Sequence, residues 1–110
     1  MPIVLVEMTG ASSGRRRTIP LMYVPHGDGF LLVASQGGAP RNPVWYKNLM
    51  KDPSVLITFE GKITEMTARY LQESEKAAMW PTCVEFYPLY QDYQDRTERQ
   101  IPVFLCEATS

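Results

Sequence analysis

The sequence predicts a mainly β protein, a single domain over residues 1–110 built on a small, largely antiparallel barrel. Short runs rich in β-branched and aromatic residues recur along the chain, each bounded by Gly, Pro, Asp or Ser. Strands and helices do not alternate regularly, which disfavours a doubly wound parallel sheet. At 110 residues the chain is long enough to bury a core of its own.

Six strands are expected from these runs. The turn sequences at 26–29 and 60–62 predict antiparallel hairpins, one joining the second strand to the third and one joining the fourth to the fifth. The expected strand ranges are 3–8, 19–24, 30–35, 55–59, 63–70 and 101–106.

Composition excludes several classes of function. The net charge of -1, from 11 basic and 12 acidic residues, supplies no field for a nucleic-acid partner. The apolar opening run is too short for a membrane span or a signal sequence, and Glu7 follows it at once. Cys83 and Cys106 lie in apolar surroundings without Cys-x-x-Cys spacing, which favours buried, reduced thiols in a cytoplasmic protein over a disulfide.

A glycine pair leads into the first expected helix, 43–51. Gly37 and Gly38 allow a close approach of backbone amides to a ligand, and Asn42 is a favourable N-cap before Pro43 at the first helical position. The segment therefore suits a flat polar ligand. By local pattern alone, an ordinary capped helix after a strand explains it equally well.

The segment Thr9-Gly10-Ala11-Ser12-Ser13-Gly14 looks like the nucleotide loop of short-chain dehydrogenases. That motif needs a further glycine where Arg16 stands and a helix directly afterwards, whereas this chain continues into a strand. Small residues beside Arg15, Arg16 and Arg17 still suit a phosphate or carboxylate group. A solvated basic turn remains the alternative.

Three tyrosines fall where the second expected helix, 74–87, breaks up; we expect this helix to be N-capped by Ser74 and bent at Pro81. Tyr87, Tyr90 and Tyr93 recur at intervals of three, so their phenols share a face. Such a face can pack a planar substrate and donate a proton or hydrogen bond. A tyrosine seam closing the barrel is the alternative.

Hydrolytic and metal chemistry are poorly supported. The single histidine, His26, lies in a turn between two strands, so a histidine metal site has no second imidazole. No acidic pair has the spacing of a metal or glycosidase site.

Several motifs in one order resemble the deazaflavin (F420)-dependent nitroreductase and quinone reductase family, especially its mycobacterial nitroreductase branch. The resemblance extends from about Thr9 to Glu107. It implies a split β-barrel like that of FMN-binding pyridoxamine oxidases, with F420 as cofactor and hydride transfer to a quinone, nitroaromatic or activated enone. The motifs are Ala34-Ser35-x-Gly37-Gly38-Ala39-x-x-Asn42-Pro43-x-Trp45-Tyr46-x-Asn48-Leu49, Tyr87-Pro88-x-Tyr90-Gln91-Asp92-Tyr93-Gln94 and Thr97-x-Arg99-x-Ile101-Pro102-Val103.

The resemblance also implies roles for individual residues. Tyr90 would donate a hydrogen bond or proton to the acceptor, with Ser35 as the second candidate and Tyr87 and Tyr93 as substrate-binding partners. Arg17 would hold the acidic tail of the cofactor. The further expected cofactor contacts are Ser12, Arg15, Ser35, Gln36, Gly37, Gly38, Ala39, Trp45 and Asn48.

Two departures from the family pattern bear on the tail site. Ala11 and Ser12 stand where relatives commonly have an Arg-Lys pair, and Gln36 stands where close relatives often have Lys. Arg15 and Arg16 are the candidates to compensate. An FMN-binding oxidoreductase of the same fold and a non-catalytic deazaflavin or haem-like ligand carrier are the alternative functions.

The expected binding partner is a small planar electron acceptor. The protein is expected to be a monomer or a homodimer. Association with the inner face of the cell membrane would suit a lipid quinone, but its amphipathic anchor would have to lie outside this sequence.

Overall fold

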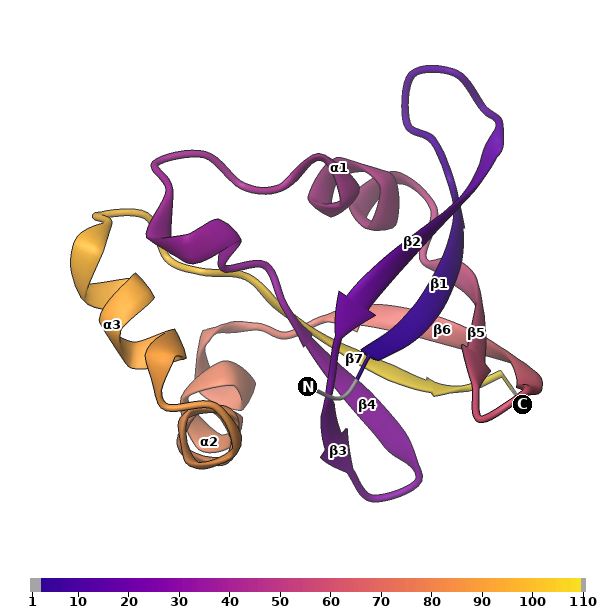
Figure 1. The fold of residues 1–110 in the computed structure, drawn as a ribbon. Helices are drawn as coiled ribbons and strands as arrows, with labels where there is room; N and C mark the ends of the chain where they lie inside the picture. Colours follow the sequence, from indigo (N-terminus) through magenta and orange to yellow (C-terminus); the bar gives the residue numbers. More distant parts are fainter. Residues whose placement is uncertain (1–2, 110) are drawn as a thin grey trace.

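The computed structural model describes residues 3–109, in which one antiparallel sheet curls around the core (Figure 1). Helices α2 (Glu73–Phe86) and α3 (Leu89–Arg96) lie side by side on one flank, and α1 (Val44–Lys51) crosses near β1 (Ile3–Thr9) and β2 (Arg16–Met22). The strands, in the order of the sheet, are β2 (Arg16–Met22), β1 (Ile3–Thr9), β5 (Ser54–Phe59), β6 (Lys62–Tyr70), β7 (Val103–Ala108), β4 (Gly29–Val33) and β3 (Val24–His26). The mainly β, antiparallel architecture is thus confirmed.

Within residues 3–109, seven strands replace the six expected, because the run 19–24 is not one strand. It divides at Tyr23 into β2, which pairs with β1, and β3, which pairs with β4. The Tyr23 ring is buried edge-on against Phe30 and Phe59, with centroids 4.9 and 5.4 Å away. This aromatic packing stabilises Tyr23 between β2 and β3, which lie at opposite ends of the sheet order. The hairpin at 26–29 is therefore confirmed only for β3 and β4, while β5 and β6 form the second hairpin as predicted.

The core follows the alternation of the strands. In β1, Val4, Val6 and Met8 are buried while Ile3 and Leu5 face outward. Helix α1 (Val44–Lys51) packs on this core through Trp45 and Leu49, which are buried in the same cluster as Val4, Val6 and Met8. Each fully buried apolar side chain contributes about 1.5–3 kcal/mol, so packing holds this eight-residue helix in place.

Both predicted helix caps are wrong. Helix α1 begins at Val44 with Pro43 as its N-cap, and the Asn42 side chain bonds Arg99 instead. Helix α2 (Glu73–Phe86) has Gln72 at its N-cap, not Ser74, and runs on through Pro81. Neither N-cap makes a side-chain hydrogen bond.

A third helix, α3 (Leu89–Arg96), was not predicted. The chain leaves α2 at Tyr87 and enters α3 after Pro88, so the tyrosine segment is ordered rather than a fraying helix end. A short 3₁₀ turn, η1 (Gln36–Gly38), follows β4 and contacts α3.

The two cysteines are free and buried, as expected. Burial raises the pKa of the Cys83 thiol to about 11 and that of the Cys106 thiol to about 12. Among the helices of residues 3–109, none is both long and apolar enough to span a bilayer.

Candidate functional site

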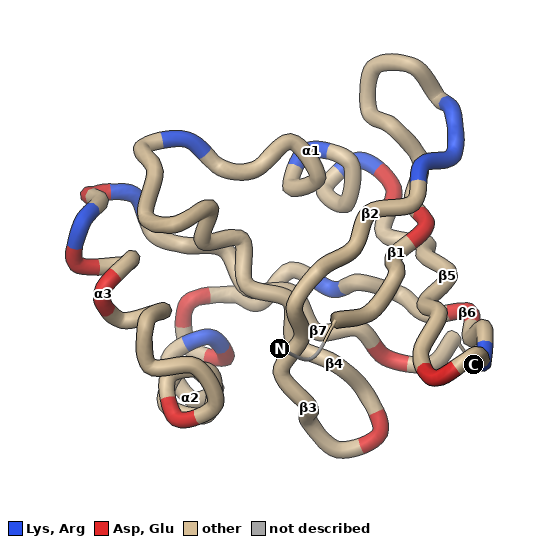
Figure 2. The backbone as a smooth tube through the Cα atoms, viewed as in Figure 1, with Lys and Arg blue, Asp and Glu red and all other residues tan. Residues whose placement is uncertain are grey.

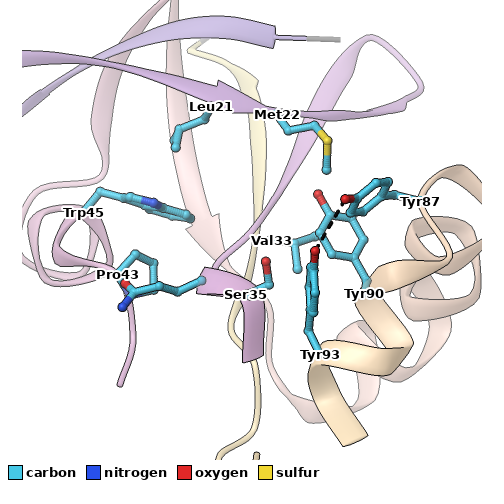
Figure 3. Close-up of a pocket in the computed structure, with 11 residues that line it drawn as sticks. Leu21, Met22, Val33, Ser35, Pro43, Trp45, Tyr87, Tyr90 and Tyr93 are labelled. Atoms are coloured by element: carbon cyan, nitrogen blue, oxygen red, sulfur yellow. Dashed lines mark hydrogen bonds between the residues drawn. The ribbon is translucent and has the colours of Figure 1, made fainter. Parts of the chain in front are cut away.

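A cavity of about 420 Å³, here called the tyrosine pocket, opens between β2, η1, α1 and α3 (Figure 3). One wall is apolar and the other carries hydroxyl and amide groups. Its lining residues are Leu21, Met22, Val33, Ser35, Gln36, Gly37, Pro43, Trp45, Tyr87, Tyr90 and Tyr93.

The three tyrosines meet in this pocket as their spacing predicts. Tyr90 is only 2 % exposed, and the Tyr87 ring packs edge-on against it at a centroid distance of 4.9 Å. The hydroxyls of Tyr87 and Tyr93 lie 3.5 Å apart (Figure 3). That hydrogen bond raises the pKa of Tyr87, and burial raises the pKa of Tyr90. The phenols of Tyr87 and Tyr90 therefore stay protonated at neutral pH, and each keeps an O–H donor.

The opposite wall suits a flat ring. Trp45 is 8 % exposed and comes from the first turn of α1, while Leu21 and Met22 end β2. Figure 3 places Trp45 and the tyrosines on facing sides of the pocket. A planar ligand can pack on the apolar wall with its polar edge turned to the phenols.

Ser35, Gln36 and Gly37 form the floor between these walls. Ser35 is 8 % exposed, and Gln36 and Gly37 have left-handed φ values of 45° and 63°. Gly38 and Ala39 are not part of the lining, although we expected them there. Gly38 instead packs on the backbone of Tyr93, and the Ala39 carbonyl accepts from Arg99.

A second cavity, of about 410 Å³, lies where the β1–β2 loop meets α1. We call it the loop pocket. Its lining residues are Gly10, Ala11, Ser12, Ser13, Arg17, Ile19, Val44 and Asn48. Ser12 and Arg17, both expected near the cofactor tail, are thus brought together.

Asn48 lines the loop pocket and not the tyrosine pocket, which Trp45 lines. Its Oδ1 accepts from the Ala11 N–H at 2.8 Å, and its Nδ2 donates to Met8 Sδ at 3.5 Å. Lys51 Nζ donates to the Ala11 carbonyl at 2.9 Å. Helix α1 therefore holds the loop in place, and the buried Asn48 amide is committed to that task.

The three consecutive arginines differ in position. Alternation along β2 turns Arg17 toward the loop pocket and Arg16 to the outer face, where Arg16 pairs with Glu7 at 3.1 Å. Arg15 is exposed and lies outside both lining sets. Arg16 is thus already engaged, and only Arg17 faces the loop pocket directly.

The two pockets lie in line along one face of β2. Arg17 and Ile19 line the loop pocket, and Leu21, on the same face, lines the tyrosine pocket. Four residues of strand span about 13 Å. Among the described residues, neither lining set includes Asp or Glu. The arrangement fits an elongated ligand with a planar aromatic head and an anionic tail.

The model of the family "F420H(2)-dependent quinone reductase" matches residues 1–108. The chain belongs to this family. An F420H(2)-dependent quinone reductase of Mycobacterium tuberculosis (strain ATCC 25618 / H37Rv) is 41% identical over 105 residues, which cover 93% of this chain and 70% of that protein. A solved structure described as an F420-H2 dependent reductase is 44% identical with a TM-score of 0.87, and the match covers 96% of this chain and 94% of that one.

The likeness also extends to the wider split-barrel fold. A FAD-binding protein of Mesorhizobium loti matches with a TM-score of 0.68 at 10% identity, over 100% of this chain and 83% of that one. This likeness concerns the fold alone. Family membership confirms the expected class, an oxidoreductase, and F420 as the family cofactor.

Sequence reasoning missed several residues of the site. Leu21, Met22 and Val33 line the tyrosine pocket, and Arg99 lies behind its floor. The alternation of β2 and the position of Arg99 within the third motif were the signals that could have indicated them.

Among residues 3–109, no three His, Cys, Asp or Glu side chains gather as a metal site. His26 is exposed at the end of β3, beside the turn.

Proposed function

We propose that this protein is an F420H2-dependent reductase of quinones and other planar conjugated or nitro-substituted acceptors. The observation that carries the proposal is the pair of pockets aligned along β2. Aromatic side chains line the tyrosine pocket, and the side chain of Arg17 lines the loop pocket. Their shape and charge match a deazaflavin head with an acidic tail. When bound in its reduced form, the cofactor supplies the hydride.

The tyrosine pocket would hold the ring and the acceptor. Trp45 and Leu21 present an apolar surface to one face of a flat molecule, and Ser35, Gln36 and Gly37 border it with polar groups. Tyr90 donates a hydrogen bond or proton to the acceptor, because its buried phenol stays protonated. Tyr87 and Tyr93 orient the acceptor through their linked hydroxyls. Ser35 Oγ is the second candidate donor.

The loop pocket would hold the tail. Arg17 contacts a phosphate or carboxylate, and Ser12 adds a hydroxyl donor. Two lysines of α1 would add positive charge near this loop in place of the cations missing at Ala11 and Ser12: Lys51, which donates to the Ala11 carbonyl at 2.9 Å, and Lys47, exposed one turn earlier. Figure 2 shows basic residues on both the β1–β2 loop and α1. Arg15 contributes charge at longer range.

Other expected cofactor contacts act indirectly. Asn48 fixes the loop through Ala11, and Gly38 and Ala39 fix the pocket floor from behind. None of these three touches the ring in the proposed arrangement.

The test is a titration of the purified protein with F420, followed by quenching of the cofactor fluorescence, with FMN titrated in parallel. We expect F420 to bind at about 1 µM or tighter, a free energy of about -8 kcal/mol, and FMN to bind more weakly. Stopped-flow mixing with F420H2 then measures acceptor-dependent oxidation with a soluble quinone, a nitroaromatic and an enone. Preference for FMN would favour the flavin enzyme of the same fold, and tight F420 binding without acceptor-dependent oxidation would favour a carrier.

A further inference from the structure

Arg99 makes an unusually complete set of contacts behind the pocket floor. It lies between α3 and β7, and its guanidinium bonds residues 57 to 65 positions earlier in the chain. Nε donates to the Ala39 carbonyl at 2.7 Å, and Nη2 donates to the Ser35 carbonyl at 2.6 Å. Nη1 donates to the Ala34 carbonyl at 3.1 Å and to Asn42 Oδ1 at 2.6 Å.

All four acceptors are neutral oxygens of one segment, 34–42. Among the described residues Arg99 forms no ion pair. Burial lowers the pKa of its guanidinium, but the group still stays charged at neutral pH. The contacts therefore depend on the fork geometry of five N–H donors, which a lysine ammonium cannot reproduce. The half-buried guanidinium of Arg99 therefore positions these acceptor oxygens and does not neutralise an opposite charge.

The segment that Arg99 holds has little regular structure of its own. It includes Ser35, Gln36 and Gly37 of the pocket floor, and three successive residues, Gln36 to Gly38, have left-handed φ values. A non-glycine residue such as Gln36 rarely takes that conformation unless its surroundings impose it. The bonds to the carbonyls on either side of η1 supply such a restraint.

The backbone of Arg99 is in turn fixed to α3. Gln94 Nε2, from α3, donates to the Arg99 carbonyl at 2.8 Å, and Gln94 Oε1 accepts from the Ile101 N–H at 3.0 Å. Arg99 thus connects the pocket floor to the element that bears Tyr90 and Tyr93.

We propose that Arg99 is a positioning residue that fixes segment 34–42 against α3. It thereby sets the distance between the pocket floor and the tyrosines of α3, Tyr90 and Tyr93. The proposal rests on the proposed function for its catalytic consequence, but not for its structural one. A displacement of about 1 Å between reacting groups can cost on the order of 100-fold in rate.

The test compares Arg99→Lys and Arg99→Gln with wild type and with Arg69→Gln, an exposed arginine paired to Glu75 and Glu107 away from the pocket. Hydrogen exchange of the amides at 35–39 is measured first, without cofactor. We expect faster exchange there in both Arg99 variants and unchanged exchange at Leu31 and Leu105, in the paired strands β4 and β7. Arg69→Gln should match wild type at all these amides.

Activity separates geometry from charge. Arg99→Lys keeps the charge, yet we expect kcat to fall about 10- to 100-fold and F420 affinity to weaken, with a thermal midpoint close to that of Arg69→Gln. If Arg99→Lys keeps wild-type exchange at 35–39 and kcat within about twofold, the proposal is wrong.

Asn42→Ala covers the case in which the Arg99 variants do not fold, because it removes one of the four bonds and leaves the arginine. It should accelerate exchange at 35–39 to a smaller degree, and unchanged exchange there would contradict the proposal. Absence of F420 binding in wild type would overturn the proposed function alone, since the exchange measurement uses no cofactor.

Discussion

Gly38 and Tyr93 are in direct backbone contact. A Cβ added to Gly38 would stand 2.7 Å from the Tyr93 carbonyl oxygen and 3.0 Å from its Cα, closer than real Cβ atoms come to a carbonyl oxygen. Gly38 also has a left-handed φ of 80°. The end of η1, next to the pocket floor, and α3 therefore touch through the main chain, so a side chain at Gly38 would separate them.

Gly38→Ala should destabilise the protein more than Gly37→Ala. Both positions have left-handed φ, but a Cβ at Gly37 meets nothing within 4 Å. The contact with Tyr93 should add about 1–3 kcal/mol to the loss at Gly38. Urea unfolding of the two variants measures the difference, and equal losses would show that the close approach is not constraining.

Tyr90→Phe should lower turnover about 100-fold or more while F420 affinity is retained. The substitution removes only the hydroxyl, and the buried ring keeps its packing against Tyr87 and Trp80. Stopped-flow oxidation of F420H2 by a quinone measures the effect, with Tyr70→Phe, outside the pocket, as the matched control. A variant that loses cofactor binding but reacts normally at saturating cofactor would contradict the assigned role.

Arg17→Ala should weaken F420 binding about tenfold at low ionic strength, and the effect should shrink as salt is added. Arg17 faces the loop pocket, whereas Arg16 pairs with Glu7 on the outer face. Fluorescence titration of Arg16→Ala therefore supplies the control, expected to bind like wild type. Equal weakening by both substitutions would indicate a diffuse charge effect instead of a tail contact.

Stability should decline above pH 9 because of the buried thiols. Burial raises the pKa of Cys83 to about 11 and of Cys106 to about 12 from the ordinary value of 9.0. Above pH 9 the unfolded thiols lose protons while the folded ones stay neutral, so their stabilising contribution is complete below pH 9 and is lost toward pH 11–12.

Urea unfolding at pH 8 and pH 10 measures this decline, expected to be about 3 kcal/mol for the two thiols. The double variant Cys83→Ala, Cys106→Ala should show a smaller decline over the same range. If the double variant declines as steeply as wild type, other groups carry the pH dependence.

Many local features of the chain were predictable from its sequence, although both helix caps and α3 were not. Alternation and turn residues act over a few neighbouring positions, so all the expected strands but 19–24, the hairpin at 60–62 and the shared face of Tyr87, Tyr90 and Tyr93 follow from spacing. The same locality explains the free, buried cysteines, since their surroundings are apolar in sequence as well as in space. Motif order added the family, which the comparisons confirm.

The tertiary structure decided what depends on distant partners. The break at Tyr23 is set by rings from β4 and β5, and Asn42 is drawn from its expected cap by Arg99, 57 positions later. Asn48 likewise binds a loop 37 positions earlier. Such contacts depend on which segments the sheet brings together, and no local pattern records that. The sequence by itself thus determined the fold class and the residue types of the site, while tertiary packing decided which of them face the pockets and which hold the walls in place.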